Sequence, residues 1–219
     1  MKQPIIPGLG IVARTLFCIG RNYQEHAREM NSPVPEEPMV FLKPLSALCF
    51  NEATIPIPAK SNNVHFEAEV VVAIGKEGKN ISPDKALEHV AGYGVGIDFT
   101  ARDLQKKAKQ KGHPWSVAKG FDSFAPVSTF LPKDEVSYPG QLQLQLTQNG
   151  EIRQQGNTSD LIFPIETLIS YLSEIFTLCP GDLIFTGTPS GVGPVHKGDL
   201  LEVTLNNGRP KLTVTIDEE

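Results

Sequence analysis

The segment His65-Phe-Glu-Ala-Glu-Val-Val-Val-Ala-Ile-Gly75 constrains the fold of this chain more than any other stretch of the sequence. Its β-branched and apolar residues predict a strand. Side chains at positions i and i+2 of a strand share a face, so Glu67 and Glu69 are predicted to point the same way. Two carboxylates this close repel each other unless water or a cation screens them. Their face is therefore expected either to meet solvent or to hold a hard divalent cation.

A third oxygen ligand for such a cation is predicted at Asp98, within the segment Gly-Tyr-Gly-Val-Gly-Ile-Asp-Phe that spans 92–99. Glycines alternate along one face of this predicted strand, which indicates that another group approaches the backbone closely, and Asp98 follows on the same face. Three carboxylates would leave three positions of an octahedral Mg²⁺ or Mn²⁺ ion for water and substrate. Taken alone, Asp98 fits better as a cap for the helix predicted to follow it.

Three further side chains are candidates for holding a small anion. Arg102 and Gln105 lie three residues apart on a helix predicted to end at Gly112, where they either orient a substrate carboxylate or form an ordinary solvated face. The Gly-rich segment 185–194 lacks the Gly-Lys-Ser/Thr ending of a nucleotide-binding loop. It instead predicts a tight turn that exposes the Thr188 hydroxyl to a small ligand.

Two groups have the chemistry of catalysis. Lys119 lies between Trp115 and Phe121, and if it is partly buried there it would stabilise a developing negative charge. His26 and Glu29 lie three residues apart on a short helix predicted after Asn22. They form either an acid–base pair, in which the carboxylate orients the imidazole, or a simple surface pair.

Composition excludes several classes of function. A formal net charge of −5 over 219 residues argues against a nucleic-acid partner held through phosphate contacts. No apolar run is long enough to span a membrane, and the N-terminus lacks the pattern of a signal peptide. Three widely spaced cysteines predict reduced thiols, and hence the cytoplasm or another reducing compartment. The length fits one sizeable core, so residues 1–219 are expected to form a single domain.

Short strands outnumber helices in the sequence pattern, which predicts an α+β, β-rich fold with a mixed or antiparallel sheet. A polar–apolar alternation and an Asn149-Gly150 turn predict a β-hairpin. Apolar spacing predicts a helix over 165–178, and a Ser-Pro start with a Gly end predicts another over 81–94.

Taken together and in this order, six segments resemble the fumarylacetoacetate hydrolase family: CIGRNYQEHAREM, EEPMVFLKP, VHFEAEVVVAIG, GIDFTARDLQ, PWSVAKGFD and DLIFTGTPSGVGP. The resemblance extends over nearly the whole chain and is strongest to small members that act as acylpyruvases and oxaloacetate decarboxylases. It implies a mixed β-roll or barrel-like fold with a few peripheral helices, a bound Mg²⁺ or Mn²⁺ ion, and a homodimer.

The resemblance also implies roles for individual residues. By motif, the metal ligands are Glu67, Glu69 and Asp98. Larger members of the family have a further aspartate ligand where Ile19 stands here, so a site of three carboxylates is expected. The residues that match substrate-pocket positions are Arg102, Gln105, Lys119 and Thr188. His26 and Glu29 match the family's acid–base pair.

The resemblance thus implies an enzyme that acts on small 2-oxo acids and cleaves a C–C bond through a pyruvate enolate, as in acylpyruvate hydrolysis or oxaloacetate decarboxylation. Keto–enol tautomerisation of oxaloacetate needs the same charge layout and remains an alternative. An isomerase or hydratase of unsaturated 2-oxo dicarboxylates would need a second basic pocket residue, for which Arg21 and Arg28 are candidates. A metal-bound module without catalytic activity is the remaining possibility.

Overall fold

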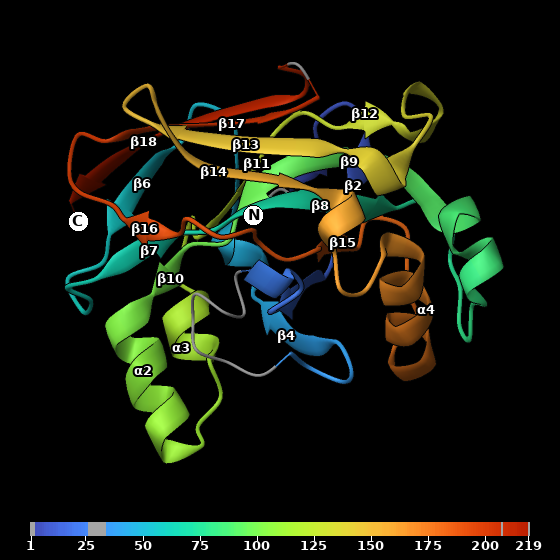
Figure 1. The fold of residues 1–219 in the computed structure, drawn as a ribbon, viewed down its shortest axis with the longest axis horizontal. Coiled ribbons are helices and arrows are strands. Elements are labelled where there is room, and N and C mark those ends of the chain that lie inside the picture. The colour runs from blue at the N-terminus through green and yellow to red at the C-terminus, as the bar shows by residue number, and fades with distance from the viewer. Residues whose placement is uncertain (1–2, 26–33, 207, 219) are drawn as a thin grey trace.

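A computed structural model describes residues 3–25, 34–206 and 208–218 of the chain. The predicted acid–base pair, His26 and Glu29, lies outside the described residues, as does Arg28. Strands dominate the described part, and they form two large sheets and two small ones (Figure 1). Parallel and antiparallel pairings occur in both large sheets, as the predicted mixed β fold requires.

The larger sheet contains eight strands and carries most of the predicted site segments. In spatial order its strands are β4 (Met39–Lys43), β3 (Leu16–Gly20), β15 (Leu183–Phe185), β8 (Ala68–Ile74), β9 (Val90–Ile97), β11 (Ala125–Val127) and β5 (Leu48–Phe50), with β12 (Leu131–Pro132) paired to β9. Both faces of β8 are buried, because this strand lies in the middle of the sheet and is covered on each side.

The second sheet contains five strands and covers one face of the first. In spatial order these are β14 (Glu151–Asn157), β13 (Gln143–Gln148), β17 (Leu200–Leu205), β18 (Lys211–Glu218) and β6 (Thr54–Ile57). Buried and partly exposed residues alternate along β13 and β17, so one face of each strand joins the core and the other stays near solvent. The predicted hairpin is confirmed as β13 and β14.

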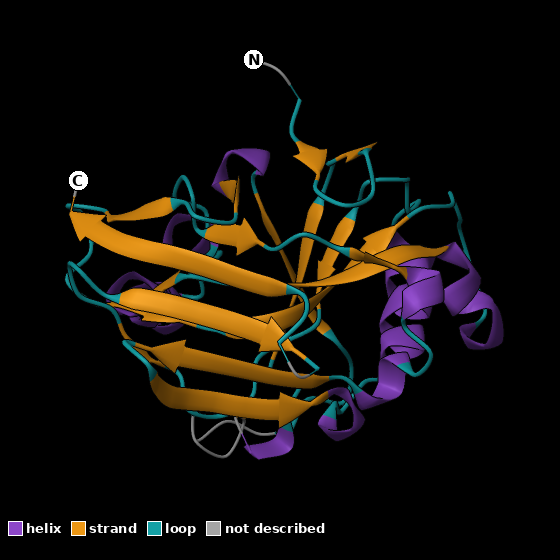
Figure 2. Cartoon of the chain, turned by 90° about the horizontal axis from the view of Figure 1, so that it is seen from above, coloured by secondary structure: helices purple, strands orange, loops and turns teal. Residues whose placement is uncertain are grey.

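The remaining elements are short. Two small sheets consist of β1 (Ile5–Ile6) with β2 (Ile11–Val12), and of β10 (Thr100–Ala101), β7 (Val64–Phe66) and β16 (Gly193–Pro194). The described α-helices are α2 (Arg102–Lys111), α3 (Ser116–Lys119) and α4 (Ile165–Ile175). The 3₁₀ turns are η1 (Leu45–Ala47), η2 (Pro83–His89), η3 (Lys133–Glu135), η4 (Pro139–Gln141) and η5 (Thr158–Asp160). Figures 1 and 2 show the five-stranded sheet across one face of the molecule and α2, α3 and α4 away from it, so the helices are peripheral as predicted.

The core fills the space between the two large sheets. Apolar side chains of β8 and β9 meet those of β13 and β17 there, in one cluster of fully buried residues. Close packing explains the alternating glycines of β9. A Cβ atom at Gly94 would lie 3.1 Å from the Phe130 ring, and one at Gly96 would lie 2.8 Å from the Phe185 ring. The groups that approach this strand at Gly94 and Gly96 are therefore aromatic rings of the protein itself, and at Gly92 it is the Leu131 carbonyl.

Two predicted helices have different limits in the structure. The helix predicted over 81–94 is wrong beyond His89, because η2 ends there and Val90 begins β9. Pairing with β8 satisfies the backbone of this glycine-rich stretch, for which a helix is unfavourable. The helix predicted over 165–178 ends at Ile175, and Phe176 is extended with its ring 5.0 Å from that of Phe17.

The predictions for α2 and for the cysteines are confirmed. Helix α2 ends at Gly112, whose φ of 64° lies in the left-handed region that glycine adopts at little cost. Cys18, Cys49 and Cys179 are free thiols. Within the described ranges, no helix combines the length and the apolar character needed to cross a membrane.

Candidate metal centre and active site

Glu67, Glu69 and Asp98 lie beside two breaks between strands, one between β7 and β8 and the other between β9 and β10. Glu67 separates β7 from β8, and Asp98 follows the last residue of β9. The Asp98 N–H donates to the Glu67 carbonyl at 2.8 Å, so these residues lie opposite each other across the ladder. Glu69 pairs with Gly96 of β9.

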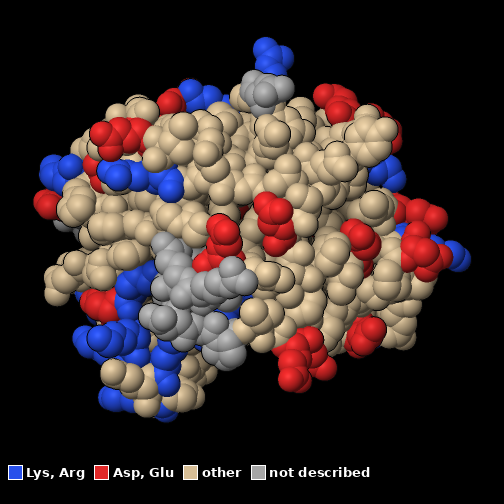
Figure 3. All heavy atoms as spheres, in the orientation of Figure 1, with Lys and Arg blue, Asp and Glu red and all other residues tan. Residues whose placement is uncertain are grey.

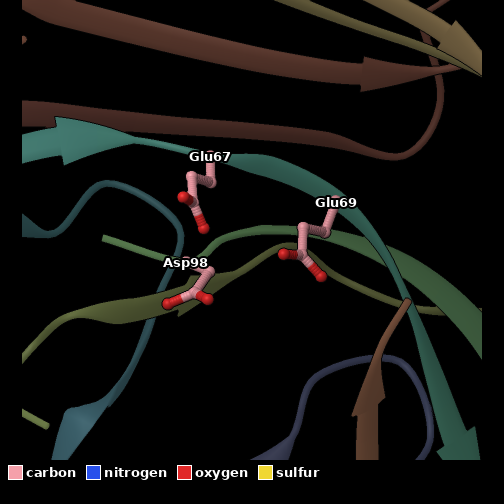
Figure 4. Close-up of side chains that lie close together, drawn as sticks. All are labelled: Glu67, Glu69 and Asp98. Carbon is pink, nitrogen blue, oxygen red and sulfur yellow. The ribbon is translucent and has the colours of Figure 1, made fainter. Parts of the chain in front are cut away.

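The three carboxylates point into one space, from the β7–β8 segment on one side and the end of β9 on the other (Figure 4). Ligand oxygens of all three lie within 4.8 Å of one another. The exposed fractions are 6% for Glu67, 2% for Glu69 and 1% for Asp98. The alternative that this strand face meets solvent is therefore wrong. Asp98 is also not a helix cap, since the N-cap of α2 is Ala101.

Three basic side chains contact two of these carboxylates. Lys119 Nζ lies 2.8 Å from Glu67 Oε2 and 2.5 Å from Asp98 Oδ2, and it is 2% exposed. Arg102 Nη2 lies 2.5 Å from Glu67 Oε1, and Lys43 Nζ lies 2.6 Å from Asp98 Oδ1. Burial lowers the pKa of Lys119, but Asp98 and Glu67 outweigh it, so the pKa is raised and the ammonium stays charged.

Glu69 has no such partner. Among the residues that the structure describes, no cation lies within ion-pair distance of its carboxylate, and Oε2 accepts one hydrogen bond, from the Gly187 N–H at 2.7 Å. Burial raises the pKa of Glu69 well above its usual range, and the negative charges of Asp98 and Glu67 raise it further. The neutral acid is therefore favoured at this position until a further cation is added.

The residues present fit a hard divalent cation. All three donors are carboxylate oxygens, the set that Mg²⁺ and Mn²⁺ prefer over the His and Cys of zinc sites. Asp98 Oδ1 is buried and receives no hydrogen bond, although Lys43 lies at ion-pair distance. A cation bound by Glu67, Glu69 and Asp98 would satisfy this oxygen and would neutralise Glu69.

Arg102 and Gln105 come from the first turn of α2 and form one wall. Arg102 Nη1 donates to Gln105 Oε1 at 3.0 Å, which agrees with the predicted i, i+3 contact. Gln105 is 4% exposed and the Arg102 side chain 11%, so the alternative of a solvated helix face is wrong. The Lys119 ammonium lies 4.8 Å from the centre of the Phe41 ring. The sequence had instead predicted that Trp115 and Phe121 flank this lysine.

Thr188 closes the site from the loop after β15. It is 4% exposed, and its hydroxyl accepts a hydrogen bond from Gln154 Nε2 at 2.8 Å. All seven predicted site residues in the described ranges line one pocket, of about 30 Å³: Glu67, Glu69, Asp98, Arg102, Gln105, Lys119 and Thr188. A larger hollow of about 470 Å³ lies beside Tyr23 and Pro189, but its described lining contains no Lys or Arg.

Three residues that support the site were missed by sequence reasoning. Lys43, 3% exposed, donates to the carbonyls of Phe99 and Phe124 and thereby ties the segment after Asp98 to the end of β4. A lysine within the apolar strand Met-Val-Phe-Leu-Lys is the one signal that could have indicated it.

Gln154 and Asn22 fix the backbone around the carboxylates. Gln154 Oε1 accepts from the Ala68 N–H at 2.9 Å, between the two glutamates, while its amide holds Thr188. Asn22 is fully buried and donates to the Thr186 carbonyl at 2.8 Å, next to the Gly187 N–H that contacts Glu69. The side chain of Asn22 thus bonds to distant loops.

Comparison with known proteins finds one family. Residues 15–216 match the family model described as fumarylacetoacetate (FAA) hydrolase C-terminal. Among curated relatives, the mitochondrial oxaloacetate tautomerase of Homo sapiens is 44% identical over 205 residues, covering 94% of this chain and 92% of that protein. The mitochondrial oxaloacetate decarboxylase of Dictyostelium discoideum is 45% identical over 190 residues, covering 86% and 87%.

A solved structure gives the same result. The fumarylpyruvate hydrolase of Pseudomonas aeruginosa, determined with Mn²⁺ and pyruvate, superposes with a TM-score of 0.90 at 41% sequence identity. The match covers 95% of this chain and 91% of that one.

Proposed function

Because this chain belongs to the fumarylacetoacetate hydrolase family, we propose that it is a divalent-metal-dependent enzyme that breaks a bond at C3 of small 2-oxo acids. The proposed substrates are oxaloacetate and acylpyruvates, and the common product of the bond cleavage is an enolate. The observation that carries the proposal is the buried cluster of Glu67, Glu69 and Asp98 with the Lys119 ammonium placed against it.

The charges of the cluster explain the need for a metal. When all three are ionised, its carboxylates balance the three cations that contact them, Lys43, Lys119 and Arg102, which leaves no excess positive charge within the cluster for a substrate anion. When bound, a divalent cation would supply Lewis acidity toward the C2 carbonyl of the substrate. Mg²⁺ and Mn²⁺ both suit the ligand set.

We assign the remaining steps to side chains of the chain itself. Lys119 holds a fixed positive charge in a buried position, where it lowers the energy of negative charge developing on the C2 oxygen. Arg102, Gln105 and Thr188 would orient the C1 carboxylate. His26, oriented by Glu29, is the proposed proton-transfer group.

Three reactions share this enolate and differ in the bond that breaks. Tautomerisation removes a proton from C3 and returns it to the C2 oxygen. Decarboxylation of oxaloacetate breaks C3–C4 and releases CO₂ with no water consumed. Hydrolysis of an acylpyruvate adds water to the C4 carbonyl before C3–C4 breaks, which leaves pyruvate and a carboxylic acid. Relatives named tautomerase, decarboxylase and hydrolase are consistent with one site that supports a common step.

The test measures each substrate with Mg²⁺, with Mn²⁺ and with EDTA. Enol absorbance follows oxaloacetate tautomerisation, and coupled pyruvate detection follows both C–C cleavages. We expect turnover that EDTA abolishes and either metal restores. The variant His26→Ala should lose acetylpyruvate hydrolysis, which needs an activated water, and should retain decarboxylation, which does not. No turnover of either substrate with either metal would refute the proposal.

A further inference from the structure

The pocket changes in character from its floor to its mouth. The floor consists of buried side chains, among them the carboxylates and Lys119, whereas Arg21 and Trp115 are partly exposed and Lys109 is exposed. The carboxylates and Lys119, which the proposed function places around the reacting end of a 2-oxo acid, form this buried floor. The far end of the substrate would then lie toward the mouth.

Lys109 is a cation at the mouth that no carboxylate of the described residues neutralises. It lies on the face of α2 that carries Arg102 and Gln105, because positions 102, 105 and 109 follow the i, i+3, i+7 spacing. Its ammonium lies 5.1 Å from the centre of the Trp115 ring. Within the described ranges no carboxylate lies at ion-pair distance from it, whereas Arg102 is bound to Glu67 and Gln105.

Like charges surround Lys109. Partial desolvation of the ammonium lowers the pKa of Lys109, and the positive charges of Arg21 and Arg102 lower it further. Arg21 lines the same pocket, with its backbone in the left-handed region at φ 59°. Figure 3 shows Lys and Arg side chains gathered over α2, on a chain whose net charge is −5. This arrangement attracts an anionic group to the mouth of the pocket.

We propose that the Lys109 ammonium, assisted by Arg21, binds the distal carboxylate of a 2-oxo dicarboxylic acid and so selects diacids over monoacids. The proposal rests on the proposed function, since it names the substrate class of the same site. The Trp115 ring holds the Lys109 side chain over the pocket without neutralising its charge, which leaves the ammonium free to donate to an oxygen of the substrate.

The kinetic test compares Lys109→Met with Lys107→Met, which removes the same charge from the same helix but does not line this pocket. For oxaloacetate, a diacid, we expect Lys109→Met to raise KM about tenfold, as for the loss of one charge-assisted hydrogen bond, with kcat little changed. For acetylpyruvate, a monoacid, KM should stay the same. Lys109→Arg should restore the wild-type KM for oxaloacetate. Equal effects of Lys107→Met and Lys109→Met, or equal effects on both substrates, would overturn the proposal.

A binding test separates this proposal from the proposed function. Trp115 is the single tryptophan of the chain and lines the pocket, so its fluorescence reports ligand binding. L-Malate and L-lactate, titrated with Mg²⁺ present, differ in the distal carboxylate and are not turned over by the proposed reactions. The wild type should bind malate about tenfold more tightly than lactate, and Lys109→Met should remove that preference. If the wild type turns over no 2-oxo acid yet shows this binding pattern, the proposed function fails and the role of Lys109 in binding the distal carboxylate stands. If Lys109→Met still prefers malate over lactate, the proposal for Lys109 is refuted.

Discussion

Replacing either glutamate of the cluster by glutamine should change the stability of the metal-free protein, and the two changes should have opposite signs. Glu67 and Glu69 are two residues apart, point into the same space and are both buried. They differ in their partners. Glu67 contacts Arg102 and Lys119, whereas the carboxylate of Glu69 accepts a hydrogen bond from the Gly187 N–H and has no cation at ion-pair distance in the described structure.

Glu69→Gln is expected to stabilise. Burial, with Asp98 and Glu67, raises the pKa of Glu69, which means that the charged form is less favourable in the folded state than in the unfolded one. A glutamine keeps the shape, and its carbonyl oxygen can accept the Gly187 hydrogen bond. We therefore expect the free energy of unfolding to rise by roughly 1–3 kcal/mol at neutral pH.

Glu67→Gln is expected to destabilise. It removes the ion-pair partner of Arg102 and one of the two carboxylates that contact Lys119, which is 2% exposed. Removing one member of a buried ion pair typically costs about 3–5 kcal/mol, because the other charge stays buried without compensation. Lys119 keeps its contact with Asp98, so the lower end of this range is expected.

The difference between wild type and Glu69→Gln should depend on pH. A carboxylic acid whose pKa is higher in the folded state makes the folded protein bind more protons, so stability falls as pH rises. The loss begins near the usual glutamate pKa of about 4.3 and continues up to the raised pKa of Glu69. The advantage of Glu69→Gln should grow through this window and then level off, since glutamine does not titrate.

Urea denaturation in EDTA, followed by circular dichroism between pH 4 and pH 8, measures these changes. Thermal unfolding with increasing Mg²⁺ is the companion assay. Wild type should gain stability as Mg²⁺ rises, because a ligand that binds only the folded state stabilises it. Both variants should lose most of that gain. If Glu69→Gln in EDTA at pH 7 is less stable than wild type, the reasoning about Glu69 is wrong.

Three other substitutions test the supports of the site. Lys43→Met should lower the free energy of unfolding by about 3–5 kcal/mol in urea denaturation, since Asp98 Oδ1 loses its cation in a buried position. Asn22→Ala should cost about 2–4 kcal/mol in the same assay, because it removes three hydrogen bonds to distant loops. Gly96→Ala should lower Tm and cost about 1–3 kcal/mol, as its Cβ would lie 2.8 Å from Phe185 and 2.9 Å from Val71.

Local periodicity made part of this structure predictable. The two-residue repeat of strands places Glu67 and Glu69 on one face, and the helical repeat brings Arg102 against Gln105. Both inferences use spacings of only a few residues, for which the backbone geometry is fixed. The same reasoning failed over 81–94, where the start of a helical turn is followed by residues that pair with β8. Tertiary pairing decided that boundary.

Other features depend on contacts between segments far apart in the sequence. Lys43 bonds to a carbonyl 56 residues away, Gln154 to an amide 86 residues away, and Asn22 to a carbonyl 164 residues away. No periodicity within one element indicates such contacts, because the sheet order brings those elements together. The roles of His26 and Glu29, the single domain, the homodimer and the cytoplasmic location stay predictions.

Glu67 has cationic partners and Glu69 has none among the described residues, and this difference indicates a function for the cluster without reference to any family. If the cluster served stability alone, a neutral side chain at position 69 would serve better than a buried carboxylate whose pKa is raised. A carboxylate at that position becomes favourable only when a further cation joins Lys43, Lys119 and Arg102. The buried Glu69 carboxylate costs the metal-free protein folding free energy. A bound cation removes this cost, and the free energy recovered adds to the affinity for the cation. The destabilising residue is thus the one that most directly indicates what the pocket binds.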